Sequence, residues 1–124
     1  MYTLTIESSF SSAHALRGYK GPCENLHGHT WKVEVALVGE KLNEIGIMVD
    51  FKDVKAKLNK IIGRFDHQNL NDLPEFKIIN PSCENISKII FEQLKPSLPE
   101  LQKVTVWESP TTSASYHPSA DMLK

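Results

Sequence analysis

The sequence predicts an α+β domain, in which a four-stranded, mostly antiparallel sheet carries two helices on one face. Segments that alternate with period two lie towards both ends of the 124-residue chain, and two segments with helical periodicity lie between them. The resulting order is ββααββ. A chain of this length is expected to form one domain, residues 1–124. Two helices cover only one face, so the other face and the edges are expected to be buried in an oligomer.

The first half of the chain supplies two strands. Residues 2–10 alternate between apolar and polar side chains and are predicted to be a half-buried strand. Residues 11–26 are rich in Ser, Gly and Pro and are predicted to be a loop. Residues 29–38 are predicted to be the second strand. One parity of this segment, extended upstream, is expected to face inward, and it comprises His27, His29, Trp31, Val33, Val35 and Leu37.

Two amphipathic helices follow a turn. The first is predicted from about Asp50, its N-cap, to Arg64. The second opens with Ser82 as N-cap and is ended by Pro96. Residues 65–81 between them are predicted to be a loop. The expected apolar stripes are Phe51, Val54, Leu58, Ile61, Ile62 and Phe65 in the first helix and Ile86, Ile89, Ile90 and Leu94 in the second.

The last part of the chain is predicted to complete the sheet. Residues 102–108 form the third strand, which Pro110 ends, and residues 112–117 form the fourth. The tail 118–124 is expected to be frayed.

Charge and hydropathy exclude several classes of function. The formal net charge of −1 argues against non-specific binding to nucleic acid or membranes. The sequence contains no run of about eighteen apolar residues, so no transmembrane helix is expected. The N-terminus lacks the basic start and apolar block of a signal peptide, and we therefore expect a cytoplasmic protein. Cys23 and Cys83 are then expected to stay reduced.

Three histidines have the spacing of a metal site. His27 and His29 are two residues apart, and in an extended chain such residues point to the same face. His14 lies upstream in a Ser-rich segment. Three neutral imidazoles with one open position form a typical catalytic zinc site. The spacing leaves open an alternative, a closed structural zinc site in which Cys23 is the fourth ligand.

Further side chains suggest acid–base chemistry. Cys23 follows a Gly-Pro turn close to the histidines, where a thiolate serves as a nucleophile or general base. Asp66 and His67 are a candidate carboxylate–imidazole pair, although adjacent side chains often diverge. The loop cations Arg17 and Lys20 either bind an anionic substrate tail or are ordinary solvated charges.

Glu108 shares the inward parity of Val104 and Val106 in its strand. A carboxylate buried there needs a partner, because an unpaired buried charge is costly. The donor edge of a cyclic guanidine or amidine satisfies both oxygens with two parallel hydrogen bonds. The alternative is that the strand ends at Trp107 and Glu108 is solvated.

Together these motifs resemble the family of 6-pyruvoyl-tetrahydropterin and 6-carboxy-tetrahydropterin synthases, which have the tunnelling fold. The resemblance covers nearly the whole chain, and the motifs occur in the family's order. They are Phe10-x3-His14, Cys23-x3-His27-Gly28-His29, Met48-Val49-Asp50-Phe51, Asp66-His67-x-Asn69-Leu70-Asn71, Asn80-Pro81-Ser82-x-Glu84-Asn85 and Trp107-Glu108-Ser109-Pro110.

The resemblance implies roles for these residues. Zn²⁺ would be held by the three histidines at 14, 27 and 29, and Cys23 would be the proton-abstracting thiolate. Asp66 and His67 would form a second acid–base pair, Glu108 would anchor the pterin ring, and Ser82, often Thr in the family, would contribute to substrate binding. The resemblance also implies a homohexamer of two stacked trimers with sites between subunits.

The implied substrate is 7,8-dihydroneopterin triphosphate. The short spacing between Cys23 and His27 resembles the bacterial queuosine-pathway branch, a lyase that makes 6-carboxy-tetrahydropterin and releases acetaldehyde and triphosphate. Glu24 is a departure, because a related branch uses glutamate in place of the cysteine and makes 6-hydroxymethyl-dihydropterin for folate synthesis. That product, alone or as a second activity, is the enzymatic alternative. The alternative outside catalysis is a structural zinc protein.

Overall fold

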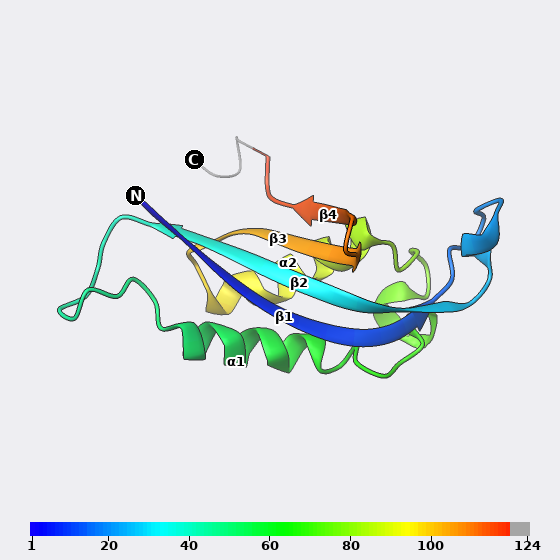
Figure 1. Ribbon diagram of the computed structural model, residues 1–124, viewed down its shortest axis with the longest axis horizontal. Coiled ribbons are helices and arrows are strands. Elements are labelled where there is room, and N and C mark those ends of the chain that lie inside the picture. Colours follow the sequence, from blue (N-terminus) through cyan, green and yellow to red (C-terminus); the bar gives the residue numbers. More distant parts are fainter. Residues whose placement is uncertain (120–124) are drawn as a thin grey trace.

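The computed structural model describes residues 1–119 and confirms the predicted ββααββ order. Four strands form one antiparallel sheet in the order β1-β2-β3-β4 (Figure 1). Residues 120–124 of the tail that was expected to be frayed lie outside the described part of the chain. The elements are β1 (Tyr2–His14), β2 (His27–Gly39), α1 (Phe51–Ile62), α2 (Cys83–Leu94), β3 (Leu101–Ser109) and β4 (Thr112–Tyr116).

β1 and β2 are longer than predicted. Their register runs without a shift from Tyr2 opposite Gly39 to His14 opposite His27. The predicted end of β1 at residue 10 is therefore wrong, as is the predicted start of β2 at residue 29. Residues 11–13 have loop-like composition, but their backbone is paired on both sides: with β2, and with the segment 66–69 along the outer edge. This tertiary pairing keeps a serine-rich segment extended.

β3 covers only part of β2. Their pairing runs from Leu37 opposite Leu101 to Lys32 opposite Trp107. The end of β2 that carries His27 and His29 therefore extends beyond its β3 partner. The sheet is open at that point, next to the last residues of β3.

Both helices lie on one face of the sheet, as predicted (Figure 1). α1 packs under β1, and α2 packs under β3 and β4. The inward parities of the strands are confirmed, because Ile6 and Phe10 of β1 and Trp31, Val33, Val35 and Leu37 of β2 are buried against the helices. Phe51 is an exception to the predicted stripe of α1. It is 59% exposed and lines an apolar cavity of about 280 Å³ with Tyr2, Leu42 and Ile47.

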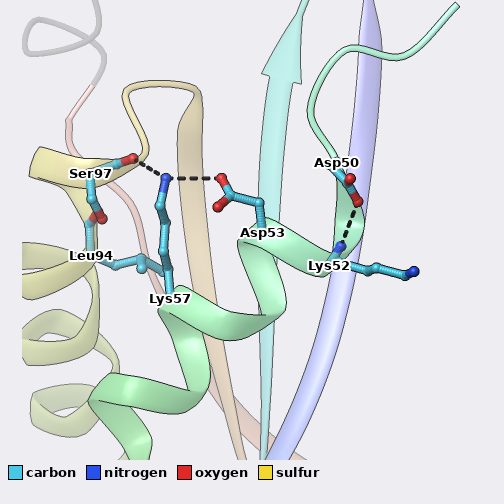
Figure 2. Close-up of polar contacts among 6 residues, drawn as sticks. All are labelled: Asp50, Lys52, Asp53, Lys57, Leu94 and Ser97. Carbon is cyan, nitrogen blue, oxygen red and sulfur yellow. Dashed lines mark hydrogen bonds and ion pairs between the residues drawn. The ribbon is translucent and has the colours of Figure 1, made fainter. Parts of the chain in front are cut away.

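Side chains fix the ends of the helices. Asp50 and Ser82 are the N-caps, as predicted, and accept from the backbone N–H of Lys52 at 2.9 Å and of Asn85 at 3.2 Å. Lys57 of α1 pairs with Asp53 of the same helix at 3.0 Å and donates to the Ser97 carbonyl at 3.1 Å, which connects α1 to the 3₁₀ turn Lys95–Ser97 after α2 (Figure 2).

The connection between the helices is more ordered than the predicted loop. It contains two 3₁₀ turns, Leu70–Asp72 and Pro74–Phe76, and the side chains of Leu70 and Phe76 are fully buried. Both anchors follow the segment 66–69, which contacts β1, and Leu70 is directly adjacent to it. In residues 1–119 no helix combines the length and the hydropathy needed to cross a membrane.

Candidate active site

Three histidines meet where β1 and β2 end. His14 is the last residue of β1, and His27 and His29 begin β2. One ligand atom from each lies within 4.8 Å of the other two. The register explains this proximity, because His14 lies opposite His27 and His29 shares the face of His27. The sequence therefore places the three rings together through one pair of strands.

Carbonyl groups select the tautomers of two of these rings. Nδ1 of His14 lies 2.7 Å from the Pro81 carbonyl oxygen, and Nδ1 of His27 lies 2.7 Å from that of Asn25. A carbonyl oxygen only accepts, so each Nδ1 carries the proton and each Nε2 keeps its lone pair. This is the arrangement of ligating histidines in metalloproteins.

The free ring nitrogens fit a divalent cation. Nε2 of His14 and Nε2 of His29 are buried and have no hydrogen-bond partner within residues 1–119. Burial lowers the pKa of His14 and of His29, which favours the neutral, ligating form. A metal ion would satisfy these orphaned atoms. The group of candidate ligands in the described chain does not include Cys23, so the geometry favours an open site over a closed one.

Cys23 and Glu24 lie in the connection between the two histidine-bearing strands. Both belong to the 3₁₀ turn Pro22–Glu24, and the Leu16 N–H donates to the Cys23 carbonyl at 2.9 Å across the base of the loop. Cys23 is half-buried, whereas Glu24 is exposed. The two candidate bases thus occupy successive positions with different access to solvent.

Asp66 and His67 do converge, despite being adjacent. Nδ1 of His67 lies 2.9 Å from Oδ2 of Asp66, because His67 adopts a left-handed backbone with φ of 56°. The pair is attached to β1, where Ser11 donates its N–H to Asp66 at 2.8 Å and accepts from the His67 N–H at 2.6 Å. The Ser11 bond and then His67 hold the pKa of Asp66 below its usual value. The imidazole itself is 82% exposed on the outer side of β1.

Glu108 lies between two cavities at the open end of the sheet. One, of about 650 Å³, is also lined by His29, Lys32 and Trp107. The other, of about 210 Å³, is also lined by Cys83 and Glu84. Glu108 is close enough to the histidines for its charge to raise the pKa of His14 and His29, although burial outweighs this effect. One cavity therefore contains both a candidate metal ligand and a carboxylate.

Cys83 is a site residue that the sequence did not suggest. Its Sγ lies 3.8 Å from Oε2 of Glu108. Burial, followed by the charge of Glu108, raises the pKa of Cys83 to about 12, so the thiol keeps its proton and donates to the carboxylate. The parity of β3 indicates where Glu108 points, but no local pattern shows which residue of α2 it meets.

Two other candidates have structural contacts. Ser82 Oγ accepts the N-cap hydrogen bond of α2, next to Cys83. The Arg17 guanidinium donates to carbonyl groups of residues 76, 77 and 79. The structure therefore favours neither an anion-binding nor a freely solvated Arg17.

The fold and the site define a class of protein: a small α+β domain with a three-histidine metal-binding cluster beside a cavity that contains a carboxylate. Within that class, the chain belongs to the 6-pyruvoyl tetrahydropterin synthase family, whose model matches residues 3–119. The architecture is accordingly the tunnelling fold of that enzyme family.

Relatives in this family carry different activity names. The chain is 34% identical to the 6-carboxy-5,6,7,8-tetrahydropterin synthase of Synechocystis, over 94% of this chain and 93% of that protein. It is 35% identical to a dihydroneopterin monophosphate aldolase of Pyrococcus furiosus, over 82% and 84% of the two chains. The solved structure of Caenorhabditis elegans 6-pyruvoyl tetrahydropterin synthase superimposes with a TM-score of 0.86 at 31% identity, covering 95% and 96%.

Proposed function

We propose that this protein converts 7,8-dihydroneopterin triphosphate to 6-carboxy-5,6,7,8-tetrahydropterin with release of acetaldehyde and triphosphate. The observation that carries the proposal is the cavity of about 650 Å³ that contains both His29 of the histidine cluster and Glu108. A pterin substrate presents a guanidine-like edge at one end and side-chain hydroxyls at the other. The carboxylate and the metal cluster are complementary to these two ends.

In this proposal His14, His27 and His29 hold Zn²⁺ through Nε2. When bound, the metal supplies Lewis-acid polarisation of the side-chain hydroxyls and acidifies the adjacent C–H bonds. Glu108 accepts two parallel hydrogen bonds from the pterin edge and so fixes the ring, with Ser82 at the neighbouring helix start. Cys23 removes a proton as the thiolate.

Asp66 and His67 form the second acid–base pair. The carboxylate orients the imidazole through Nδ1 and leaves Nε2 to exchange protons with substrate. His67 is exposed on the outer side of β1, which fits a site completed by a neighbouring subunit. We therefore include the homohexamer of two stacked trimers in the proposal. The proposal also includes a single domain per chain and a cytoplasmic location.

The second candidate function is cleavage of the same substrate to 6-hydroxymethyl-7,8-dihydropterin. Two observations support it: Glu24 next to Cys23 in an exposed turn position, and the similarity to a relative named as an aldolase. Glu24 would act as the base in place of Cys23, or beside it if the protein carries both activities.

The deciding experiment is a product assay. The zinc-loaded protein is incubated with dihydroneopterin triphosphate, and the products are identified by mass. 6-Carboxy-tetrahydropterin with acetaldehyde supports the first proposal, and 6-hydroxymethyl-dihydropterin alone overturns it in favour of the second. Formation of both assigns two activities, and Cys23→Ala and Glu24→Ala then identify the base for each. Absence of turnover favours the structural zinc protein.

A further inference from the structure

Arg17 has four of its five guanidinium N–H groups bound to one short segment of the chain. Nη1 donates to the Lys77 carbonyl at 2.8 Å, and Nη2 donates to the carbonyls of Phe76 and, at 2.7 Å, Ile79. Nε donates to Oδ1 of Asn80 at 3.2 Å. All four acceptors are uncharged and lie in residues 76–80. The planar fork of arginine therefore organises the segment between the 3₁₀ turn that ends at Phe76 and the start of α2.

The side chain of Asn80 makes two hydrogen bonds to the backbone of Arg17, as a neighbouring strand would. Its Oδ1 accepts the Arg17 backbone N–H at 2.9 Å, and its Nδ2 donates to the Arg17 carbonyl at 2.9 Å. Asn85 of α2 in turn donates to the Asn80 carbonyl at 2.9 Å. Residues 17 and 80 are thus joined by both side chains and by backbone groups. We call this set of contacts, Arg17 with residues 76–80, the Arg17 clamp.

The clamp spans the hydrogen bond that orients His14. Pro81, whose carbonyl accepts from Nδ1 of His14 at 2.7 Å, directly follows Asn80. Arg17 lies three residues beyond His14 on the other segment. Ala15, which lies between His14 and Arg17, is held in a similar way. Its N–H donates to Oδ1 of Asn71 at 2.8 Å, and its carbonyl accepts from Nδ2 of Asn71 at 2.9 Å. The donor and the acceptor of the His14–Pro81 bond therefore lie on two segments whose separation the clamp fixes.

We propose that Arg17 is a positioning residue for the three-histidine metal centre. The clamp holds the Pro81 carbonyl against Nδ1 of His14, which keeps Nε2 of that ring free and directed at the metal position. The inference rests on the metal site of the proposed function and adds to it a residue that does not contact the metal. It also explains why a loop arginine near a site for an anionic substrate is directed at carbonyl groups instead.

The test uses the full-length protein with Arg17→Ala, Arg17→Lys and Asn80→Ala. Lys20→Ala is the matched control, because it removes an exposed cation from the same loop. Zn²⁺ affinity is measured by competition with a chromogenic chelator. Second-sphere changes weaken metal binding by about 10- to 100-fold, and we expect about tenfold for each clamp variant and no change for Lys20→Ala. Arg17→Lys is expected to weaken zinc binding because one ammonium group cannot bind all four acceptors that surround the planar guanidinium.

A second measurement examines His14 without metal. In the apo wild type the hydrogen-bonded Nδ1–H of His14 should give a downfield proton resonance in NMR, and the clamp variants should weaken or lose it. If the clamp has only a structural role, its variants have a lower melting temperature but unchanged zinc affinity in the folded protein and an unchanged His14 resonance. This result would overturn the proposal. If Arg17 instead binds substrate, its substitution raises KM at saturating zinc and leaves the zinc affinity unaltered. This result would also overturn the proposal.

If Arg17→Ala does not fold, Arg17→Lys and Asn80→Ala still give both readouts, the zinc affinity and the His14 resonance. If the wild type binds no zinc, the metal site of the proposed function is wrong, whereas the His14 resonance still decides whether the clamp orients the ring.

Discussion

Cys23 and Glu24 occupy successive positions of one 3₁₀ turn. In the proposed function Cys23 is a base and not a metal ligand, so its substitution tests whether catalysis and metal binding are separate. We predict that Cys23→Ala binds Zn²⁺ with wild-type affinity and loses about 10²- to 10⁴-fold in turnover, the contribution typical of a general base. Metal content and product formation measured on one sample check this. A loss of zinc in Cys23→Ala would instead identify the thiol as a fourth ligand.

Cys83 offers a second prediction at the level of one residue. Its thiol donates to one oxygen of Glu108 and so restricts the carboxylate that would bind the pterin edge. Cys83→Ala should raise KM for the pterin substrate about threefold to tenfold, the value of one hydrogen bond, with little change in kcat. Cys83→Ser retains a donor and should restore KM. Steady-state kinetics at saturating zinc measure both, and an unaltered KM in Cys83→Ala would contradict the assignment.

Sequence spacing predicted that the three histidines cluster, because two of them share a face through local strand geometry and the third is brought opposite by the pairing of β1 with β2. His27 and His29 share a face through the strand period alone, and the parity of β3 placed Glu108 on the inward side. The partners of these residues were not predictable. The Pro81 carbonyl and the Cys83 thiol approach from segments far away in the sequence, and no periodicity specifies such contacts.

At the level of elements, an ion pair fastens the end of α1 to the turn Pro74–Phe76. Arg64 and Glu75 form two hydrogen bonds, at 2.5 and 3.0 Å, and Arg64 holds the pKa of Glu75 below its usual value. Since the folded-state pKa is the lower one, the pair stabilises the protein above the unfolded-state pKa of about 4.3 and loses this effect as the pH falls through the folded-state value.

Glu75→Gln should therefore lower the free energy of unfolding by about 1 kcal/mol at pH 7, a modest amount because Arg64 is half-exposed. The difference between the variant and the wild type should vanish once the pH is below the folded-state pKa of Glu75. Urea unfolding of both apo proteins at a series of pH values checks this, and a difference independent of pH would exclude the ion pair as its cause.

The helices were predicted well because their caps and apolar stripes are local signals, and Asp50 and Ser82 both serve as N-caps. The ends of β1 and β2 were predicted poorly. Residues 11–13 are extended because they pair with the segment 66–69, and that segment is fixed by the buried side chain of Leu70. Composition alone cannot reveal a strand that depends on a partner more than fifty residues away.

At the level of the whole molecule, β1 and β4 are the edges of the sheet and would pair with neighbours in the proposed hexamer. Ser11 and Ala13 direct their N–H groups away from β2, to Asp66 and Gln68, so the odd-numbered residues of this regular strand face the outer edge. Thr5 is one of them. Thr5→Pro removes an outward N–H without removing a bond to β2.

We therefore predict that Thr5→Pro keeps the fold of the chain, dissociates the proposed hexamer and loses activity, because the proposed sites lie between subunits. Sedimentation with circular dichroism measures assembly and fold, and Thr5→Val, which keeps the N–H, is the control. A wild type that sediments as a monomer, or a hexameric Thr5→Pro protein, would contradict this arrangement.

The confinement of all three histidines to β1 and β2 has a consequence for folding kinetics. Pairing of these two strands closes only the loop of residues 15–26, so the rings can meet without contacts from either helix. Zinc can then stabilise the folding transition state as well as the native state, and it should accelerate refolding in stopped-flow experiments. If zinc only slows unfolding, the pairing of β1 with β2 forms after the rate-limiting step of folding.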